Sequence, residues 1–196
     1  MPHPQYQGRH SLRRLDGTRA RPLTAQIIEL YRSCYTAPPW NETPQQLAAY
    51  PAKLQAALER PAFTAHVACD PAGRLTGICY GWPSPPDLTA SEAAGNPVYD
   101  AVLTALGPDG AAALTRGAFE VAELFVHPDA QRQGLGRHLL TVAVAGWPAA
   151  WLITHPNAPA ARLYQRLGWR QHAALPRGLY PQLPLAIFTR TDPRPA

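Results

Sequence analysis

The sequence predicts a mixed α/β fold, in which a mostly antiparallel central sheet also contains parallel strands and carries helices on its flanks. Two observations lead to this expectation. Apolar, β-rich runs around a turn stand in the first half of the chain, and strands alternate with helical segments in the second half. The 196 residues are 46% hydrophobic, which is enough for one core, so we expect a single domain over residues 1–196.

The first half should contain two helices and a hairpin. Apolar residues at helical spacing predict the first helix, with Thr24 as its candidate cap, and the run Pro38-Pro39-Trp40 breaks it. A turn signal, Asp70-Pro71-Ala72-Gly73, separates the two β-rich runs. The expected elements are helices over residues 23–35 and 43–59 and strands over residues 64–69 and 75–82. The basic residues 1–21 are expected to form a flexible tail.

The second half should begin with an insertion of loop and short-helix character over residues 83–117. Strands and helices then alternate: a strand that starts at Phe119, a helix that opens at Gly134, a strand at Trp151, a helix at Asn157 and a last strand over residues 185–190. Asn157 is a good N-cap with Pro159 in the first turn, and Gly168 is a good residue to end that helix.

Two glycines stand in the loop that opens the Gly134 helix. A dinucleotide fingerprint would need a third glycine where the chain has Leu139, and a P-loop would need Gly-Lys followed by Ser or Thr. Both patterns fail. The remaining turn points backbone N–H groups and the positive end of a helix at one spot, which suits a pyrophosphate.

Two blocks of sequence together resemble the GCN5-related N-acetyltransferase (GNAT) superfamily. The first is Gln131-x-x-Gly134-x-Gly136 after an apolar strand that ends in Val126-His127-Pro128. The second is Asn157 with Tyr164 seven residues on, followed by Gly168-Trp169. The resemblance implies acetyl-CoA as the acyl donor, splayed parallel strands with the donor in the V-shaped gap, direct attack of an amine in a ternary complex, and a tendency to form homodimers.

The same resemblance implies the residues that hold coenzyme A. A strand end contributes backbone groups to pantetheine, the loop holds the pyrophosphate, and the last helix meets the pantetheine arm. The implied cofactor-binding residues are Leu124, Phe125, Val126, Arg132, Gln133, Gly134, Leu135, Gly136, Arg137, Asn157 and Tyr164.

Three residues are candidates for the acid–base chemistry. Tyr164 is the candidate general acid, because a phenol with a pKa near 10 matches a thiolate leaving group and the resemblance assigns it that role. Glu120 and Glu123 are the candidate bases; they have opposite strand parity, so one of them should face the cleft. The resemblance to histone-type members favours Glu120. His127 and His155 are weaker candidates. No metal site is expected, because the three cysteines form no C-x-x-C pattern.

The charge distribution suggests a small cationic amine as the acceptor. Residues 75–115 contain acidic but no basic residues. The insertion over residues 83–117, together with residues 35–42, should form the acceptor side. A protein or peptide acetyltransferase is an alternative. It is weakened by Leu152, which stands where similar ribosomal-protein enzymes carry a glutamate. A non-catalytic acyl-CoA-binding regulatory module is another.

Other partners and locations are disfavoured by the sequence. The net charge of +5 raises the question of nucleic acid, but basic residues flank the glycine loop instead of interleaving with aromatic residues along one face. The longest apolar stretch, residues 142–153, is too short to span a bilayer. Without an apolar signal segment at the N-terminus, the cytoplasm is the expected location.

Overall fold

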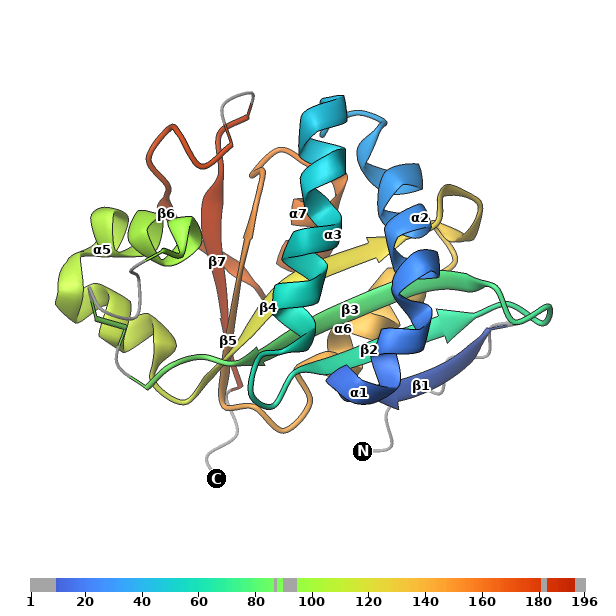
Figure 1. Ribbon diagram of the computed structural model, residues 1–196. Helices are drawn as coiled ribbons and strands as arrows, with labels where there is room; N and C mark the ends of the chain where they lie inside the picture. The colour runs from blue at the N-terminus through green and yellow to red at the C-terminus, as the bar shows by residue number, and fades with distance from the viewer. Residues whose placement is uncertain (1–9, 87, 90–94, 181–182, 193–196) are drawn as a thin grey trace. The chain divides into compact units, whose positions relative to one another are not determined.

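The computed structural model describes residues 10–86, 88–89, 95–180 and 183–192 and has a mixed α/β architecture (Figure 1). The strands are β1 (Ser11–Leu15), β2 (Thr64–Cys69), β3 (Leu75–Pro83), β4 (Ala118–Val126), β5 (Ala149–Thr154), β6 (Arg170–Ala174) and β7 (Ala186–Thr191). They form one seven-stranded sheet in the order β1-β2-β3-β4-β5-β7-β6. β4 and β5 are parallel, whereas β1–β2, β2–β3, β5–β7 and β6–β7 are antiparallel. The expected fold class is confirmed.

The chain divides into two compact units, and β4 runs through both. The first unit comprises Met1–Trp82 and Val121–Ala145, and the second comprises Pro83–Glu120 and Gly146–Ala196. The helices of the first unit are α1 (Gly17–Ala20), η1 (Arg21–Leu23), α2 (Thr24–Tyr35), α3 (Pro44–Leu58), η2 (Pro128–Ala130) and α6 (Leu135–Ala143). Those of the second unit are α5 (Pro97–Thr115) and α7 (Pro159–Arg166).

In the first unit, α2 and α3 cover one face of the strands and α6 covers the other (Figure 1). The core between α2, α3 and the hairpin contains Ile27, Leu54, Val67 and Ile78, all fully buried. On the opposite face, a Cβ atom at Gly77 of β3 would lie 2.9 Å from Leu139 Cδ1 of α6. The absence of a side chain at this glycine therefore lets α6 approach the strands closely.

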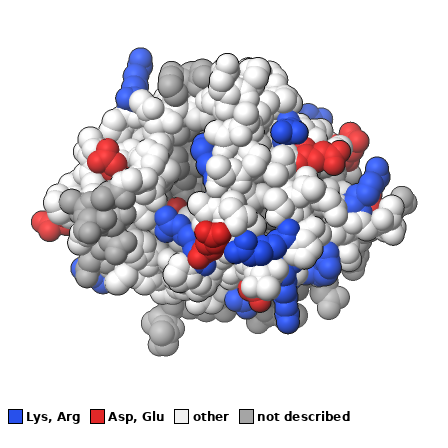
Figure 2. Space-filling model, viewed as in Figure 1, with Lys and Arg blue, Asp and Glu red and all other residues white. Residues whose placement is uncertain are grey.

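The expected flexible basic tail is wrong from Ser11 onward, while residues 1–9 lie outside the described residues. Ser11–Leu15 forms β1, which pairs with β2, and Leu15 is only 8% exposed. Asp16 then caps α1 by accepting a hydrogen bond from the Arg19 N–H at 2.8 Å. Basic side chains gather over α1 and β1 on the face shown in Figure 2. An edge strand that is held by backbone pairing needs little alternation of apolar and polar residues. The arginines of β1 therefore gave no strand pattern in the sequence.

The local signals of the hairpin and of α3 are confirmed. Asp70 Oδ1 accepts from the backbone N–H groups of Ala72 and Arg74, which closes the turn between β2 and β3. Thr43 and Gln46 form a capping box at the start of α3. α2 starts differently from the expectation: Thr24 donates its hydroxyl hydrogen to the Arg21 carbonyl oxygen at 2.7 Å, and the helix continues from η1 without a side-chain cap.

In the second unit, α5 packs on the sheet through a buried cluster that includes Tyr99, Val102, Trp151 and Ile187. The helix is kinked where Gly107, with φ of 67°, precedes Pro108. The loop and short-helix character expected for residues 83–117 therefore becomes two helical pieces joined at a kink. Among the acidic residues of this insertion, Asp87 and Glu92 lie outside the described residues, whereas Asp100 and Asp109 are exposed on α5.

α7 begins one residue later than expected. Its N-cap is Ala158, which makes no side-chain capping bond, and Asn157 is exposed before it, so the assignment of Asn157 as the cap is wrong. The Ala158 N–H donates to the His155 carbonyl oxygen at 3.0 Å in a tight turn, and Pro159 supplies the preset φ of the first helical position. The end is as expected: Gly168 has φ of 83°, and the Trp169 N–H donates to the Tyr164 carbonyl oxygen.

β6 was not expected from the sequence, because its residues are mostly exposed and lack apolar alternation. It is held by antiparallel pairing with β7. Within the described residues, no helix combines the length and the apolar character needed to cross a bilayer.

Candidate active site

The loop between β4 and α6 opens a helix at Gly134, as expected. Gln131 Nε2 donates to the Val126 carbonyl oxygen at 3.0 Å, so the loop folds back onto the strand end. Gly134, with φ of 80°, is the N-cap of α6, and the helix's first bond runs from the His138 N–H to the Gly134 carbonyl oxygen. The N–H groups of the first turn therefore point out of the helix start. They can hold a pyrophosphate together with the positive helix end.

The side chains around this turn fit the same use. Arg132, Gln133 and Arg137 are exposed, whereas Leu135 is buried and anchors the helix start. Of the strand residues expected to contact pantetheine, Leu124 is half-buried, and Phe125 and Val126 are buried. Polar side chains on the loop and the first turn of α6 are thus exposed, whereas the apolar side chains of the strand end and Leu135 are at least partly buried.

Glu123, on β4 just before this loop, has an unusual environment. Its Oε2 accepts a hydrogen bond from the Tyr35 hydroxyl at 2.7 Å. Burial raises the pKa of Glu123 to about 7; the Tyr35 bond and the Lys53 charge oppose this rise, and the Glu42 charge adds to it. A carboxyl group with a pKa near 7 takes and releases a proton at neutral pH, which is what a general base needs.

Beside Glu123 stands a stack of four aromatic rings, here termed the aromatic column: Tyr50, Tyr31, Tyr35 and Trp40. The ring centroids of Tyr50 and Tyr31 are 3.5 Å apart, and those of Tyr31 and Tyr35 are 4.0 Å apart, with the rings nearly parallel. Trp40 follows at 5.4 Å from Tyr35, tilted by 37°. Tyr50 and Tyr31 are buried, whereas Tyr35 and Trp40 are half-buried, so the column runs from the core to the surface.

Two carboxylates lie along the aromatic column. The Tyr31 hydroxyl donates to Glu42 Oε1 at 2.8 Å, and the Tyr35 hydroxyl donates to Glu123. The column is also fixed to β4, because the ring of Phe125 lies edge-on to Tyr31 with centroids 5.6 Å apart. The position of the Glu123 carboxylate is therefore set by α2 as well as by its own strand.

Glu120, the other candidate base, lies in a different environment. It is 6% exposed, and its Oε2 accepts a hydrogen bond from the Tyr99 hydroxyl of α5 at 2.7 Å. Glu120 belongs to the second unit and Glu123 to the first. The two glutamates thus face different elements, as their opposite strand parity predicts.

Tyr164, the candidate acid, lies on the buried face of α7 with Ala161. It is 5% exposed, and its ring contacts Trp169 and Phe188 with centroids 6.0 and 6.4 Å away. The residues α7 contributes to the expected site belong to the second unit, whereas Glu123 and the loop belong to the first. Each half of the expected site is thus assembled within one unit.

The two histidines considered as bases make structural contacts. His127 Nδ1 accepts from the Asp129 N–H at 3.2 Å and so caps η2. His155 Nδ1 lies 3.0 Å from the Pro184 carbonyl oxygen. In the part of the chain that the structure describes, no three His, Cys, Asp or Glu side chains are grouped so that they could hold a metal ion.

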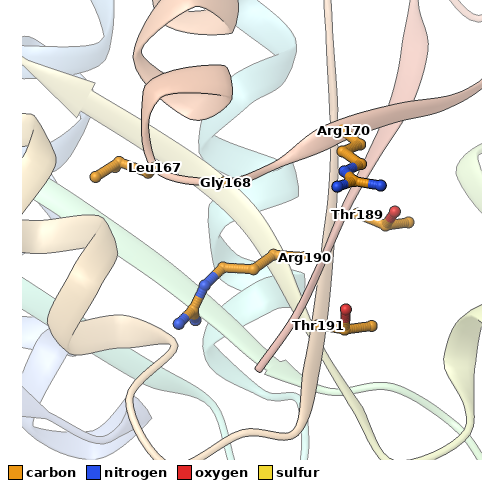
Figure 3. A pocket seen from close by; sticks show the side chains of 6 residues that line it. All are labelled: Leu167, Gly168, Arg170, Thr189, Arg190 and Thr191. Carbon is orange, nitrogen blue, oxygen red and sulfur yellow. The ribbon is translucent and has the colours of Figure 1, made fainter. Parts of the chain in front are cut away.

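A cavity of about 480 Å³ opens elsewhere in the second unit, at the start of β6 and the end of β7 (Figure 3). It is lined by Leu167, Gly168, Arg170, Thr189, Arg190 and Thr191. Arg190 points to the side of β7 that faces Leu167, whereas Arg170 and the two threonines lie on the other side (Figure 3). None of the expected catalytic or cofactor-binding residues lines this cavity.

Part of the sequence matches a known family of proteins. The acetyltransferase (GNAT) domain matches residues 92–171, a segment that contains β4, the glycine loop and α7. Over this segment the chain carries a GNAT acetyltransferase domain. The fold agrees: among solved structures, the ribosomal-protein-S18-alanine N-acetyltransferase of Escherichia coli superposes with a TM-score of 0.60 at 16% identity, covering 93% of each chain. The PaiA N-acetyltransferase of Thermoplasma acidophilum, solved with coenzyme A, superposes with a TM-score of 0.59 at 12% identity, covering 93% of this chain and 99% of that one.

One GNAT relative is more similar in sequence. The [ribosomal protein bS18]-alanine N-acetyltransferase of Escherichia coli K12 is 40% identical over 88 residues, which cover 40% of this chain and 59% of that enzyme. This chain thus matches less than two thirds of the enzyme's length. The fold is one that this chain shares with N-acetyltransferases, one of which was solved with coenzyme A.

The side chains that bind or pack beside the two glutamates were not predicted from the sequence. Residues 35–42 were expected on the acceptor side, but no role was expected for Tyr31, Tyr50 or Tyr99. Tyr31 and Tyr35 stand four residues apart on a helix, which is a signal that they share one face. Nothing in the sequence indicates that this face meets Glu123, which is 88 positions away from Tyr35.

Proposed function

We propose that this GNAT protein transfers the acetyl group of acetyl-CoA to the primary amine of a small cationic molecule, by direct attack of the amine in a ternary complex. The observation that carries the proposal is the Glu123 carboxyl group. It lies on the strand that leads into the pyrophosphate-type loop, it is held by Tyr35, and its pKa is about 7. A binding module without chemistry has no need of such a group.

The chemistry requires a base because the acceptor arrives protonated. An alkylamine with a pKa near 10.4 is neutral in only about one part in a thousand at pH 7, which costs roughly 4 kcal/mol. Glu123 takes a proton from the ammonium group. The nitrogen lone pair then attacks the thioester carbonyl carbon, and the bond from carbon to sulfur breaks. As the amide forms, the nitrogen loses a second proton, which replaces the one that the acid donates to the thiolate.

The leaving thiolate needs a proton, and we assign Tyr164 as its donor. A phenol with an ordinary pKa near 10 is matched to a thiol, and proton transfer of this kind typically contributes ~10²–10⁴ in rate. Backbone N–H groups of residues 132–137 hold the pyrophosphate, assisted by Arg132 and Arg137. The backbone of Leu124–Val126 and the side chain of Asn157 contact the pantetheine arm.

Between the two glutamates we choose Glu123 as the base. The pKa of Glu123 lies in the working range, and the residue lies on β4 three positions before the strand end that leads into the loop. Glu120 is buried against Tyr99 and is better placed to hold α5 on the sheet. A small cationic acceptor is supported by Glu42, whose negative charge acts on Glu123.

A second candidate is acetylation of a protein N-terminus. The match to the bS18-alanine enzyme favours it. The position of Leu152 weakens it: Leu152 is 3% exposed, and a glutamate would be expected there in such enzymes. Both candidates predict turnover, so the acceptor distinguishes them.

An acceptor screen tests the proposal. Thiol release from acetyl-CoA is followed with amino sugars, polyamines, amino acids and peptides that begin with alanine. The expected result is turnover with cationic small amines that falls at least about a hundredfold in Tyr164→Phe. Turnover with peptides alone would replace the first candidate by the second. Coenzyme A binding without transfer to any acceptor would point to a regulatory module.

A further inference from the structure

Glu42 and Tyr31 form a buried contact that the proposed acid–base chemistry does not use. Glu42 is 9% exposed, and its Oε1 accepts a hydrogen bond from the Tyr31 hydroxyl at 2.8 Å. Its backbone N–H donates to the Tyr35 carbonyl oxygen at 2.9 Å, so the chain after α2 folds back onto the end of that helix. Both the backbone and the side chain of Glu42 are therefore fixed to α2, although withdrawing a carboxylate from water costs free energy.

The same helix links Glu42 to the proposed base. The rings of Tyr31 and Tyr35 stack with their centroids 4.0 Å apart and their planes 15° apart, and the Tyr35 hydroxyl donates to Glu123 Oε2 at 2.7 Å. Two neighbouring phenols of the aromatic column thus hold two different carboxyl groups. The negative charge of Glu42 acts on Glu123 and raises the pKa of Glu123, because a like charge disfavours the ionised form.

We propose that Glu42 is a positioning residue for the base: Tyr31 fixes the Glu42 carboxylate, so that a second negative charge keeps Glu123 ready to take a proton at neutral pH. The inference rests on the proposed function, in which Glu123 is the base, and deepens it by naming the residues that tune this base. A base acts best when it exchanges its proton near the working pH. Without the second charge, Glu123 would take the proton of the ammonium group less readily.

The other ionisable groups that interact with Glu123 leave this role to Glu42. They are the phenols of Tyr35, Tyr50 and Tyr80, the thiol of Cys79 and the ammonium group of Lys53. Burial raises the pKa values of Tyr50, Tyr80 and Cys79 above their ordinary ranges, so these three groups are neutral at pH 7. Lys53 is exposed on α3, so water and salt screen its charge, whereas the buried charge of Glu42 is screened much less.

Two variants of the full chain test the inference. Glu42→Gln removes the charge and keeps the shape, whereas Tyr31→Phe keeps the stacked ring and removes the hydroxyl that fixes Glu42. The first measurement is the pH profile of kcat/KM for acetyl transfer. The second is the titration of the Glu123 carboxyl carbon by NMR, with its signal identified by its absence in Glu123→Gln. The NMR titration requires neither an acceptor nor turnover.

Both midpoints should move to lower pH in Glu42→Gln, by at least about 0.3 of a pH unit, because the like charge that opposes ionisation of Glu123 is gone. Tyr31→Phe should move them in the same direction but by less, since the Glu42 charge remains and only its anchor is lost. Glu29→Gln is the matched control: Glu29 is exposed on the same helix, so the midpoints should stay within about 0.1 of a pH unit. Thermal unfolding of each variant shows that the fold is retained.

The result that overturns the inference is a Glu123 midpoint that stays in place or rises in Glu42→Gln. If Glu42→Gln does not fold, Tyr31→Phe decides alone, and an unmoved midpoint in that variant overturns the inference as well. A failed inference and a failed function look different. Acetyl transfer with a midpoint that ignores Glu42 removes only the positioning role, whereas a midpoint that follows Glu42 in a protein without transferase activity supports the coupling and removes the proposed function.

Discussion

The Tyr35 hydroxyl donates a hydrogen bond of 2.7 Å to Glu123 Oε2, joining α2 to β4 across 88 positions of sequence. The same tyrosine stacks on Tyr31, whose hydroxyl binds Glu42. A carboxyl group is thereby held in one orientation in a largely desolvated place, where burial raises its pKa to about 7. The following predictions depend on this arrangement and on the loop that follows it.

Replacing Glu123 by glutamine should lower kcat/KM for an amine acceptor by ~10²–10⁴, because the general base is lost while the shape is kept. The KM for acetyl-CoA should change little, since Glu123 is not part of the loop. Steady-state kinetics with the best acceptor of the screen measure both values. Glu120→Gln is the matched control and should keep activity within about tenfold. The reverse pattern would assign the base to Glu120.

The pH profile should show the titration of Glu123. Since the base acts when deprotonated, kcat/KM should rise with pH and reach half of its maximum near pH 7. The Tyr35 bond lowers the pKa of Glu123 against the effect of burial, so Tyr35→Phe should move the acidic limb to higher pH. An unmoved limb in Tyr35→Phe, or the same limb in Glu123→Gln, would show that another group titrates.

The free energy of unfolding should also depend on the titration of Glu123. The pKa of folded Glu123, about 7, lies above its ordinary value of 4.5, so its contribution is fully present below pH 4.5 and is lost as the pH rises through 7. Glu123→Gln removes this loss of stability with rising pH, because the glutamine side chain does not titrate. Relative to the original chain, the variant should gain on the order of 1–3 kcal/mol in free energy of unfolding between pH 4.5 and pH 8. Urea titrations at both pH values measure the difference, and a constant difference contradicts the prediction.

Features set by local sequence were predictable, and those set by contact between distant segments were not. The capping box at Thr43, the Asp70 turn and the end of α7 at Gly168 each depend on a few neighbouring residues. The glycine loop is of the same kind. β1 and β6 lie at the two edges of the sheet and are held by backbone pairing, which leaves little trace in their side chains.

In the candidate site, too, the features set by local sequence were predictable and those set by distant contacts were not. Glu120 and Glu123 could be named from their strand, and parity predicted that they face opposite ways. The choice between them depends on Tyr99 and Tyr35, which come from helices far along the chain. Their packing sets the burial and hydrogen bonding of each carboxylate, and neither can be read from spacing along the chain.

The finding that Asn157 does not cap α7 leads to a further prediction. Because Asn157 makes no capping bond, Asn157→Ala should change the free energy of unfolding by less than about 0.5 kcal/mol. Thr43→Ala, which removes a side chain that does cap a helix, should cost about 1 kcal/mol. Chemical denaturation measures both. An Asn157 variant as unstable as the Thr43 variant would restore the capping role expected from the sequence.

Gly134 combines a backbone requirement with the proposed pyrophosphate contact. Its φ of 80° is in the left-handed region, so Gly134→Ala should strain the start of α6 by about 1–2 kcal/mol and displace the N–H groups that face the anion. Gly146→Ala is a matched control, because Gly146 has φ of 83° and equally open surroundings but lies after α6. Both variants should lose similar stability, whereas only Gly134→Ala should weaken coenzyme A binding, by roughly tenfold, as one or two charge-assisted bonds are lost. Calorimetric titration with coenzyme A separates the two effects; equal affinities in the two variants would mean that the pyrophosphate does not bind at this turn.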